Sequence, residues 1–214
     1  LRSSCALVAW LARRCVGHVV AVGSSAEYGP SDEPHDEDEC PRPWSVYGAA
    51  KAAFHQLLRS SMRPHGMAAA WARVFNVTGP GEHPDRLVPW VVRSVLAGRA
   101  VDLSPGAQVR DYLDVDDVAS ALVALSSSRV DGTFNVCSGR GITLRALLGG
   151  IAERLGGAEL LRFGARPYGE HDAAVVVGRA GRLTQETGWS PVHDTDAMIE
   201  RVVSHWRERT GGSG

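Results

Sequence analysis

Two short apolar runs on either side of a helical pattern constrain the fold more than any other feature of the sequence. Residues 18–23 and 68–75 are each long enough for a buried strand and are rich in Val and Ala. Between them, residues 44–62 carry apolar side chains at helical spacing. Strand, helix and strand in this order form a crossover unit, which joins parallel strands. The sequence therefore predicts an α/β fold built on a parallel sheet.

The rest of the chain continues the alternation. Periodicity predicts further helices over 1–15, 86–97, about 117–125, 143–155 and from about 194, and further strands over 100–103, 109–115, 133–136 and 173–177. Asp116 or Asp117 is expected to cap the helix that ends near residue 125, and Thr143 the next one. The acidic run 36–39 is expected to form a solvated face, and His83 and His171 are expected to be exposed.

Composition narrows the functional classes. The chain has 214 residues and a net charge of -1, which gives no reason to expect nucleic acid as a partner. No apolar run reaches the ~18 residues that a membrane span needs, so no membrane partner is expected. The chain begins with Leu rather than Met, inside an amphipathic pattern, and looks like a piece of a longer protein. Four cysteines without Cys-x-x-Cys spacing predict free thiols and a cytoplasmic location: Cys5, Cys15, Cys40 and Cys137.

Tyr47 and Lys51 form the pair with the clearest chemical meaning. They are four residues apart in the predicted helix and therefore share one face. A free tyrosine has a pKa near 10, and an ammonium beside a phenol favours the phenolate. Such a pair can pass a proton to or from a sugar or alcohol oxygen near neutral pH. The spacing alone also fits a surface lysine beside a half-buried tyrosine, so the neighbouring motifs decide its meaning.

Those motifs occur in one order along nearly the whole chain. They are GSSAEYG at 23–29, Tyr47-x-x-x-Lys51, RVFNVTGP at 73–80, RDYLDVDDV at 110–118, FNVCSG at 134–139 and GWSP at 188–191. Together they resemble the extended short-chain dehydrogenase/reductase family of nucleotide-sugar epimerases, dehydratases and reductases. The first and fifth motifs are most similar to the GDP-4-keto-6-deoxymannose reductases.

The resemblance implies a catalytic role for three residues. Ser24 would hydrogen-bond the sugar C4 oxygen, with Ser25 as the alternate on the substrate side. Tyr47 would donate a proton to the sugar carbonyl as hydride arrives. Lys51 would favour the phenolate and hold the nicotinamide ribose, and Phe75 would also contact the cofactor, which is NAD or NADP. No metal is implied.

The resemblance also implies a site for a nucleotide-diphosphate sugar. Asn76, Arg110 and Arg166 would contact the diphosphate, for which a planar guanidinium is well suited. Two alternatives stay open: Arg110 as a surface partner of Asp111, and a different role for Arg166, since the spacing after it departs from the family pattern.

Two departures from the family pattern are informative. Dehydratases of the family carry an acid two residues before the Tyr of the first motif. That Tyr is Tyr28 here, and the residue two positions before it is Ala26. Glu27 would face away if the strand continued, because side chains alternate in a strand. Elimination is therefore not supported, whereas reduction needs only Ser24, Tyr47 and Lys51.

The second departure is the missing dinucleotide fingerprint. The family opens with a strand, Gly-x-x-Gly-x-x-Gly and a helix whose N-terminus holds the pyrophosphate, and no such motif occurs in the 214 residues. The resemblance thus implies the C-terminal part of a Rossmann-type doubly wound parallel sheet plus a smaller α/β substrate-binding domain. We expect a partial Rossmann domain over 1–80 and a mainly substrate-binding region over 81–214, with segments of about 110–136 returning to the Rossmann sheet.

These implications favour an NAD(P)-dependent nucleotide-sugar oxidoreductase that reduces a 4-keto-6-deoxy sugar. One alternative is a nucleotide-sugar C4 epimerase, which uses the same three residues. Another is a truncated, non-catalytic homologue that acts as a binding partner or is a remnant, which the missing fingerprint favours. The family often forms homodimers through a four-helix bundle, for which 1–15 and 44–62 are the candidate helices.

Overall fold

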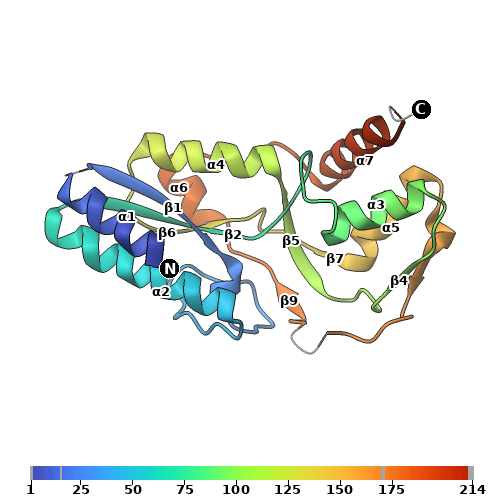
Figure 1. Cartoon of the computed structure of the whole chain (residues 1–214), viewed down its shortest axis with the longest axis horizontal. Helices are drawn as coiled ribbons and strands as arrows, with labels where there is room; N and C mark the ends of the chain where they lie inside the picture. The colour runs from blue at the N-terminus through green and yellow to red at the C-terminus, as the bar shows by residue number, and fades with distance from the viewer. Residues whose placement is uncertain (1, 15, 170–171, 212–214) are drawn as a thin grey trace.

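A three-stranded parallel sheet forms one end of the molecule (Figure 1). The computed structural model describes residues 2–14, 16–169 and 172–211. Strands β1 (His18–Ser24), β2 (Ala68–Val74) and β6 (Gly132–Val136) lie in the order β1-β2-β6, and both pairings are parallel. The predicted α/β fold with a parallel sheet is confirmed.

Helices cover both faces of this sheet. Helices α1 (Arg2–Arg13) and α2 (Val46–Met62) pack on one face, and α4 (Val115–Ser128) and α6 (Gly181–Thr187) on the other (Figure 1). Strand β2 supplies both cores because its side chains alternate between faces. Trp71 packs in the cluster that includes Leu58 of α2, while Ala70 and Ala72 pack with residues of α4 and α6.

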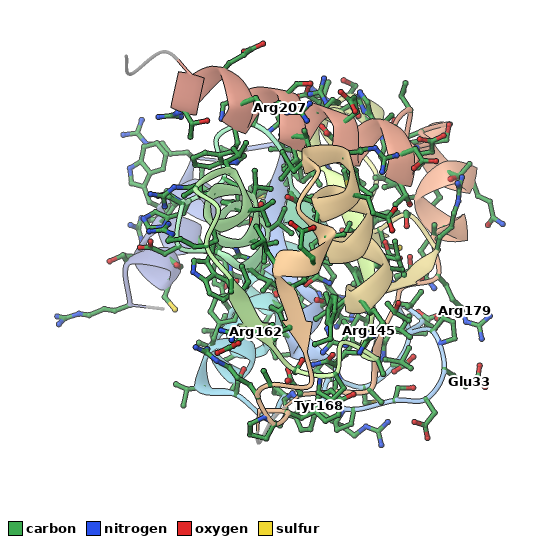
Figure 2. All side chains as sticks on the ribbon, turned by 90° about the vertical axis from the view of Figure 1, so that its right-hand side faces the viewer. Glu33, Arg145, Arg162, Tyr168, Arg179 and Arg207 are labelled. Atoms are coloured by element: carbon green, nitrogen blue, oxygen red, sulfur yellow. The ribbon has the colours of Figure 1, made fainter. Side chains whose placement is uncertain are left out.

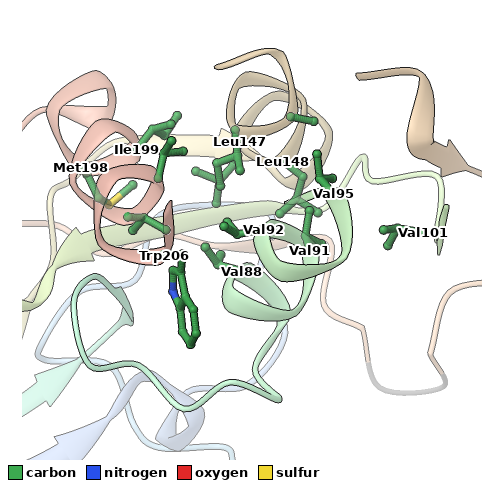
Figure 3. Packing of buried hydrophobic residues seen from close by; sticks show 14 of the residues in the cluster. Val88, Val91, Val92, Val95, Val101, Leu147, Leu148, Met198, Ile199 and Trp206 are labelled. Carbon is green, nitrogen blue, oxygen red and sulfur yellow. The ribbon is translucent and has the colours of Figure 1, made fainter. Parts of the chain in front are cut away.

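Three helices build the core at the other end of the molecule. They are α3 (Leu87–Leu96), α5 (Leu144–Leu155) and α7 (Thr195–Gly211). Val88, Val91 and Val95 form the buried stripe of α3, and Trp206 of α7 packs in the same cluster (Figure 3). The periodicity that predicted these helices thus also identified their buried faces.

Short strands complete this second part. Strands β3 (Asn76–Thr78), β5 (Val109–Asp114) and β7 (Gly141–Thr143) form a sheet that β9 (Val175–Val176) joins along β5. Strands β4 (Val101–Leu103) and β8 (Leu161–Phe163) pair separately. On their outer side, Arg162 contacts Asp102 at 2.7 Å, and Arg145 of α5 stacks over Phe163 at 4.3 Å (Figure 2). Segments of about 110–136 were expected to return to the first sheet. Strand β6 does pair with β2 of that sheet, whereas β5 belongs to the second sheet.

Three single turns of 3₁₀-helix connect these elements. They are η1 (Ser25–Glu27), η2 (Arg63–His65) and η3 (Ala158–Leu160). Helix α6 and strands β3, β7 and β8 were not predicted. They are short, and periodicity identifies only longer segments.

Two sequence-based predictions were wrong in detail. The residue that caps α4 is Asp114, whose side chain accepts a bond from the Asp116 amide at 2.9 Å, rather than Asp116 or Asp117. The acidic run 36–39 is not fully solvated, because Glu37 is buried and accepts a bond from the Asn135 amide at 3.0 Å. Asn135 lies 98 residues from Glu37 along the chain, so no local sequence pattern could have predicted this contact.

Several other expectations concern single residues. Thr143 caps α5, as predicted, and His83 is exposed. Cys5, Cys40 and Cys137 are free thiols, whereas Cys15 and His171 lie outside the described residues. Within the described part of the chain, no helix has the length and apolar character needed to cross a lipid bilayer.

Candidate active site

A cleft of about 620 Å³ lies at the carboxyl ends of β1 and β2, where ligands bind in open α/β sheets. Five of the predicted site residues line it: Ser24, Ser25, Tyr47, Phe75 and Asn76. A larger cavity of about 740 Å³ lies near the far end of α2, beside Arg59 and Arg63, and none of the predicted site residues lines it.

Ser24 reaches the cleft because the chain leaves the strand there. Its backbone is extended, and η1 begins at the next residue. The Ser24 hydroxyl oxygen accepts a bond from the Ala26 amide at 3.2 Å, and the Glu27 carboxylate accepts one from the Ser24 amide at 2.8 Å. This reciprocal arrangement is a capping box. It leaves the hydroxyl hydrogen of Ser24 available for a ligand.

Glu27 faces away from the cleft, as expected, although the reason is a turn and not a continuing strand. The strand ends at Ser24, and the 3₁₀ turn directs Glu27 into the interior, where the residue is 0% exposed. Ala26 lines the cleft instead. The cleft therefore presents a methyl group, not a carboxylate, at the position where dehydratases of the resembled family carry an acid.

Helix α2 brings Tyr47 to the same cleft, whereas Lys51, one turn further along the helix, lies beside Tyr47 and is not among the residues that line the cleft. Ser45 caps the helix by accepting a bond from the Gly48 amide at 3.0 Å, which places Tyr47 in the first turn. The predicted shared face is confirmed, since the Lys51 ammonium lies 5.8 Å from the centroid of the Tyr47 ring. Lys51 also donates to the Val22 carbonyl at 2.9 Å, which ties α2 to the end of β1.

A close backbone approach sets Tyr47 beside Ser24. A Cβ atom on Gly48 would lie 2.0 Å from the Ala26 carbonyl oxygen, so only glycine allows η1 and the first turn of α2 to pack at this distance. Tyr47 remains 58% exposed, and it lines the cleft together with Ser24 and Ser25. The arrangement presents two hydroxyl groups to one ligand.

Phe75 and Asn76 follow the end of β2 in the floor of the cleft. Phe75 is buried, and its amide donates to the Val136 carbonyl at 3.1 Å. The Asn76 side-chain amide donates to the Asp111 carbonyl at 3.1 Å. These backbone anchors fix both side chains at the point where the first sheet meets the second.

Neither of the two predicted arginines lines the cleft, and only Arg166 lines a second cavity. Arg166 lines a space of about 260 Å³ together with Asp172 and Gln108. The Arg110 guanidinium donates to the Val109 carbonyl at 2.9 Å and lies 3.8 Å from a carboxylate oxygen of Asp172. Burial lowers the pKa of Arg110, and Asp172 opposes that shift. Asp172 thus lies beside Arg110 and lines the same cavity as Arg166.

The alternative pairing of Arg110 with Asp111 on the surface is wrong. Asp111 is fully buried and accepts bonds from the amides of Ser138 and Gly139 at 2.8 and 2.9 Å. Burial raises the pKa of Asp111, and the bonds from Ser138 and Gly139 oppose that shift. Asp111 thus organises the loop after β6, and neighbouring side chains of β5 point to opposite sides.

Glu82 and Arg86 also line the cleft, although neither was predicted. The Glu82 carboxylate accepts bonds from the Thr78 hydroxyl at 2.6 Å and from Arg86 at 3.1 Å. Burial raises the pKa of Glu82, and these two bonds oppose the shift. In the sequence the pair looks like an ordinary solvated loop, and only the tertiary structure places it in the same cleft as Ser24. Nowhere among the described residues do three or more His, Cys, Asp or Glu side chains form a group that could hold a metal ion.

The chain is similar in sequence to known proteins along most of its length. The sequence model described as "NAD dependent epimerase/dehydratase family" matches residues 1–137. The chain is 29% identical to a UDP-glucose 4-epimerase of Azospirillum brasilense, with 91% of the chain and 62% of that protein covered. It is 28% identical to a GDP-6-deoxy-D-mannose reductase of Pseudomonas aeruginosa, with 95% and 70% covered.

Solved structures show the same fold. The UDP-glucose 4-epimerase of Thermus thermophilus, solved in complex with NAD, superimposes with a TM-score of 0.86 at 31% identity, covering 97% of this chain and 69% of that one. The chain therefore spans about two thirds of the length of this structure and of the curated relatives named above.

Proposed function

Because the chain belongs to the NAD-dependent epimerase/dehydratase family, we propose that it is the catalytic and substrate-binding part of an NAD(P)-dependent nucleotide-sugar oxidoreductase. The proposed reaction is reduction of the 4-ketone of a 4-keto-6-deoxy sugar nucleotide. One observation carries the proposal: Ser24 and Tyr47 line one cleft, Lys51 lies beside Tyr47, and the neighbouring Ala26 provides no acid for elimination.

The residues of the cleft have complementary roles in this reaction. The Ser24 hydroxyl donates a hydrogen bond to the C4 oxygen, since its own oxygen already accepts from the Ala26 amide. The Tyr47 hydroxyl donates the proton that the C4 oxygen gains as the ketone becomes an alcohol. The nearby Lys51 ammonium stabilises the phenolate that remains, because opposite charges attract.

The cleft fits the nicotinamide end of a dinucleotide. Val22, next to the Lys51 contact, is 45% exposed and offers an apolar surface, and Phe75 lies in the floor. Tyr47 and Lys51 would hold the ribose there. When bound, NADH or NADPH supplies the hydride. The known structure of the Thermus thermophilus epimerase, which contains NAD, supports this assignment.

We assign the nucleotide diphosphate to the region between the cleft and the second cavity. Asn76 lines the cleft, and Arg166 lines the cavity that Asp172 connects to Arg110. A guanidinium binds paired phosphate oxygens well, so Arg110 and Arg166 suit this role. The 28% identity to a GDP-6-deoxy-D-mannose reductase supports a 4-keto sugar nucleotide as the substrate.

There are two alternative functions. A C4 epimerase uses the same three residues, and relatives of this chain include UDP-glucose 4-epimerases. A non-catalytic homologue that acts as a binding partner is the other alternative. Net consumption of NADH or NADPH supports the reductase, product without net consumption supports the epimerase, and no turnover of any sugar nucleotide supports the non-catalytic homologue.

The decisive test is Tyr47→Phe in the complete protein. Removal of the phenolic hydroxyl removes the proton donor, so turnover of the sugar nucleotide should fall by about 100-fold or more while its binding is largely retained. Nicotinamide absorbance measures turnover, and calorimetry measures binding. Tyr168→Phe, on an exposed loop, is the matched control (Figure 2). Unchanged turnover in Tyr47→Phe would refute the proposed role.

We also propose a cytoplasmic homodimer. Helices α1 and α2 pack together and expose Leu7, Trp10 and Leu57 at 55%, 48% and 42%, which suits a helical interface. Sedimentation of the complete protein tests this, and a monomer at all accessible concentrations would contradict it.

A further inference from the structure

We propose that Glu27 is a positioning residue, which acts through Ser24 and does not itself touch the substrate. The inference rests on the proposed function, since Glu27 can affect the reaction only if Ser24 binds the C4 oxygen of the sugar. The Glu27 carboxylate fixes the backbone at the end of β1, and thereby fixes the direction of the Ser24 hydroxyl. No such role follows from the sequence, where Glu27 is one acidic residue beside a turn.

The Glu27 carboxylate accepts hydrogen bonds from one backbone amide and two side chains. One oxygen accepts a bond from the Ser24 amide at 2.8 Å. Both oxygens lie 3.0 Å from the indole nitrogen of Trp71, and the other oxygen accepts from the Arg73 guanidinium at 3.1 Å. The ring of His55 also lies nearby, with its Nδ1 atom 3.8 Å from a Glu27 oxygen. Glu27 therefore joins the serine turn to two side chains of the central strand β2.

The surrounding packing holds this carboxylate rigidly. Glu27 and Arg73 are 0% and 1% exposed, and Arg73 also stacks over the Tyr28 ring at 4.5 Å. A Cβ atom on Gly23 would lie 2.3 Å from the Trp71 indole nitrogen and 2.5 Å from the Glu27 carboxylate. The indole and the carboxylate thus fill the space beneath the residue before Ser24. A buried ion pair seldom adds net stability, because removing two charges from water costs about as much as their attraction gains. The buried Glu27–Arg73 pair therefore suits a role in fixing the geometry of the turn.

Glu27 affects the reaction through the direction of the Ser24 hydroxyl. The Ser24 oxygen accepts from the Ala26 amide, and this bond requires the turn that the Glu27–Ser24 bond closes. With both bonds in place, the hydroxyl hydrogen is not used within the turn and is free to point toward the cleft that Ser24 lines. Without Glu27, the Ser24 amide loses its acceptor and the turn can open. Misplacement of a catalytic group by about 1 Å can cost about 100-fold in rate.

Kinetics of the complete protein test the proposal. Glu27→Ala should lower kcat by about 100-fold and Glu27→Gln by about 10-fold, with KM for the sugar nucleotide changed less than about 3-fold, because the interaction matters only for the chemical step. Glu37→Gln is the matched control, since Glu37 is also buried and accepts a backbone bond, but from Asn135. It should keep the wild-type kcat even if it melts earlier.

A double-mutant cycle separates positioning from a general structural role. If Glu27 acts through Ser24, the variant with both Ser24→Ala and Glu27→Ala should be no slower than Ser24→Ala alone. Multiplicative losses would overturn the proposal, as would a wild-type kcat in a folded Glu27→Ala protein. If Glu27→Ala does not fold, Glu27→Gln is used in the same cycle.

Amide exchange provides a readout that does not depend on activity. Exchange of the Ser24 amide, followed by NMR, should be at least about 10-fold faster in Glu27→Ala than in wild type and unchanged in Glu37→Gln. Unchanged Ser24 exchange in Glu27→Ala would overturn the proposal. A wild-type protein without reductase or epimerase activity would instead refute the proposed function, and the exchange rates would still decide the contribution of Glu27.

Discussion

His55 is a buried titratable side chain at the rear of the candidate site. Its ring stacks on Trp71 with centroids 4.7 Å apart, and one ring nitrogen lies 3.2 Å from the Thr133 hydroxyl. Burial lowers the pKa of His55 to about 4, and the positive charges of Arg73 and Arg59 act in the same direction. His55 is therefore neutral when the protein is folded at neutral pH, and it buttresses the residue that holds Glu27.

We expect His55 to make the fold acid-sensitive. Unfolded His55 has its ordinary pKa of 6.5, so between 6.5 and about 4 the unfolded chain binds more protons, and stability falls as the pH falls through this window. The free energy of unfolding of wild type relative to His55→Gln should decrease by about 1–2 kcal/mol between about pH 7 and about pH 5. Urea denaturation of both proteins at each pH measures this difference in the free energy of unfolding. A difference that does not vary with pH would contradict this prediction.

At the scale of elements, α7 is attached to the start of α4 by one arginine. Arg201 of α7 donates to the carboxylate of Asp114 at 2.8 Å, and it also pairs with Asp116. The Asp114 side chain is fully buried and caps α4 at the same time. A buried carboxylate needs its partner, because an unpaired charge in the interior is costly. This contact ties the last helix to the end of β5.

Arg201→Met should test that link. It leaves the buried Asp114 carboxylate without its ion-pair partner, so the free energy of unfolding should decrease by about 2–3 kcal/mol. Arg99→Met, at an exposed position after α3, is the control and should change it by less than about 0.5 kcal/mol. Thermal and urea denaturation measure both variants. Equal stability of the two variants would show that α7 is held by its apolar face alone.

At the scale of the whole molecule, the proposed reaction centre lies within the 214 residues, whereas the Gly-x-x-Gly-x-x-Gly motif that binds the pyrophosphate in the family does not occur in them. Among the described residues, β1 is an edge strand of its sheet, and Lys51 caps one of its free carbonyls. The cleft offers contacts to the nicotinamide end of a dinucleotide only. Most of the affinity of the family for a dinucleotide is expected from the glycine-rich turn and the helix N-terminus at the pyrophosphate.

The 214-residue chain alone should therefore bind NADH and NADPH weakly. Calorimetry should give a dissociation constant well above the micromolar range, because the charged pyrophosphate has no site for its oxygens. The complete protein, titrated in the same buffer, is the control. Micromolar binding by the 214-residue chain would contradict the prediction and would require a pyrophosphate site that the family does not use.

The sequence by itself determined the parallel sheet, the long helices and the shared face of Tyr47 and Lys51. These features depend on local periodicity, which hydrophobic burial imposes on neighbouring residues. It also indicated Ser24 and Asn76 through short motifs. Its errors concerned the cap at Asp114, the solvated face expected for residues 36–39 and the alternative surface pairing of Arg110 with Asp111.

Only the tertiary structure decided which side chains meet. Glu27 contacts Trp71 and Arg73, more than 40 residues away along the chain (separations of 44 and 46), and Gly48 must meet the Ala26 carbonyl for Tyr47 to face Ser24. Such contacts leave no periodic trace, because each depends on where two separate elements cross. The physical reason is that burial selects residue types locally, whereas hydrogen-bond partners are selected by distance in the folded chain.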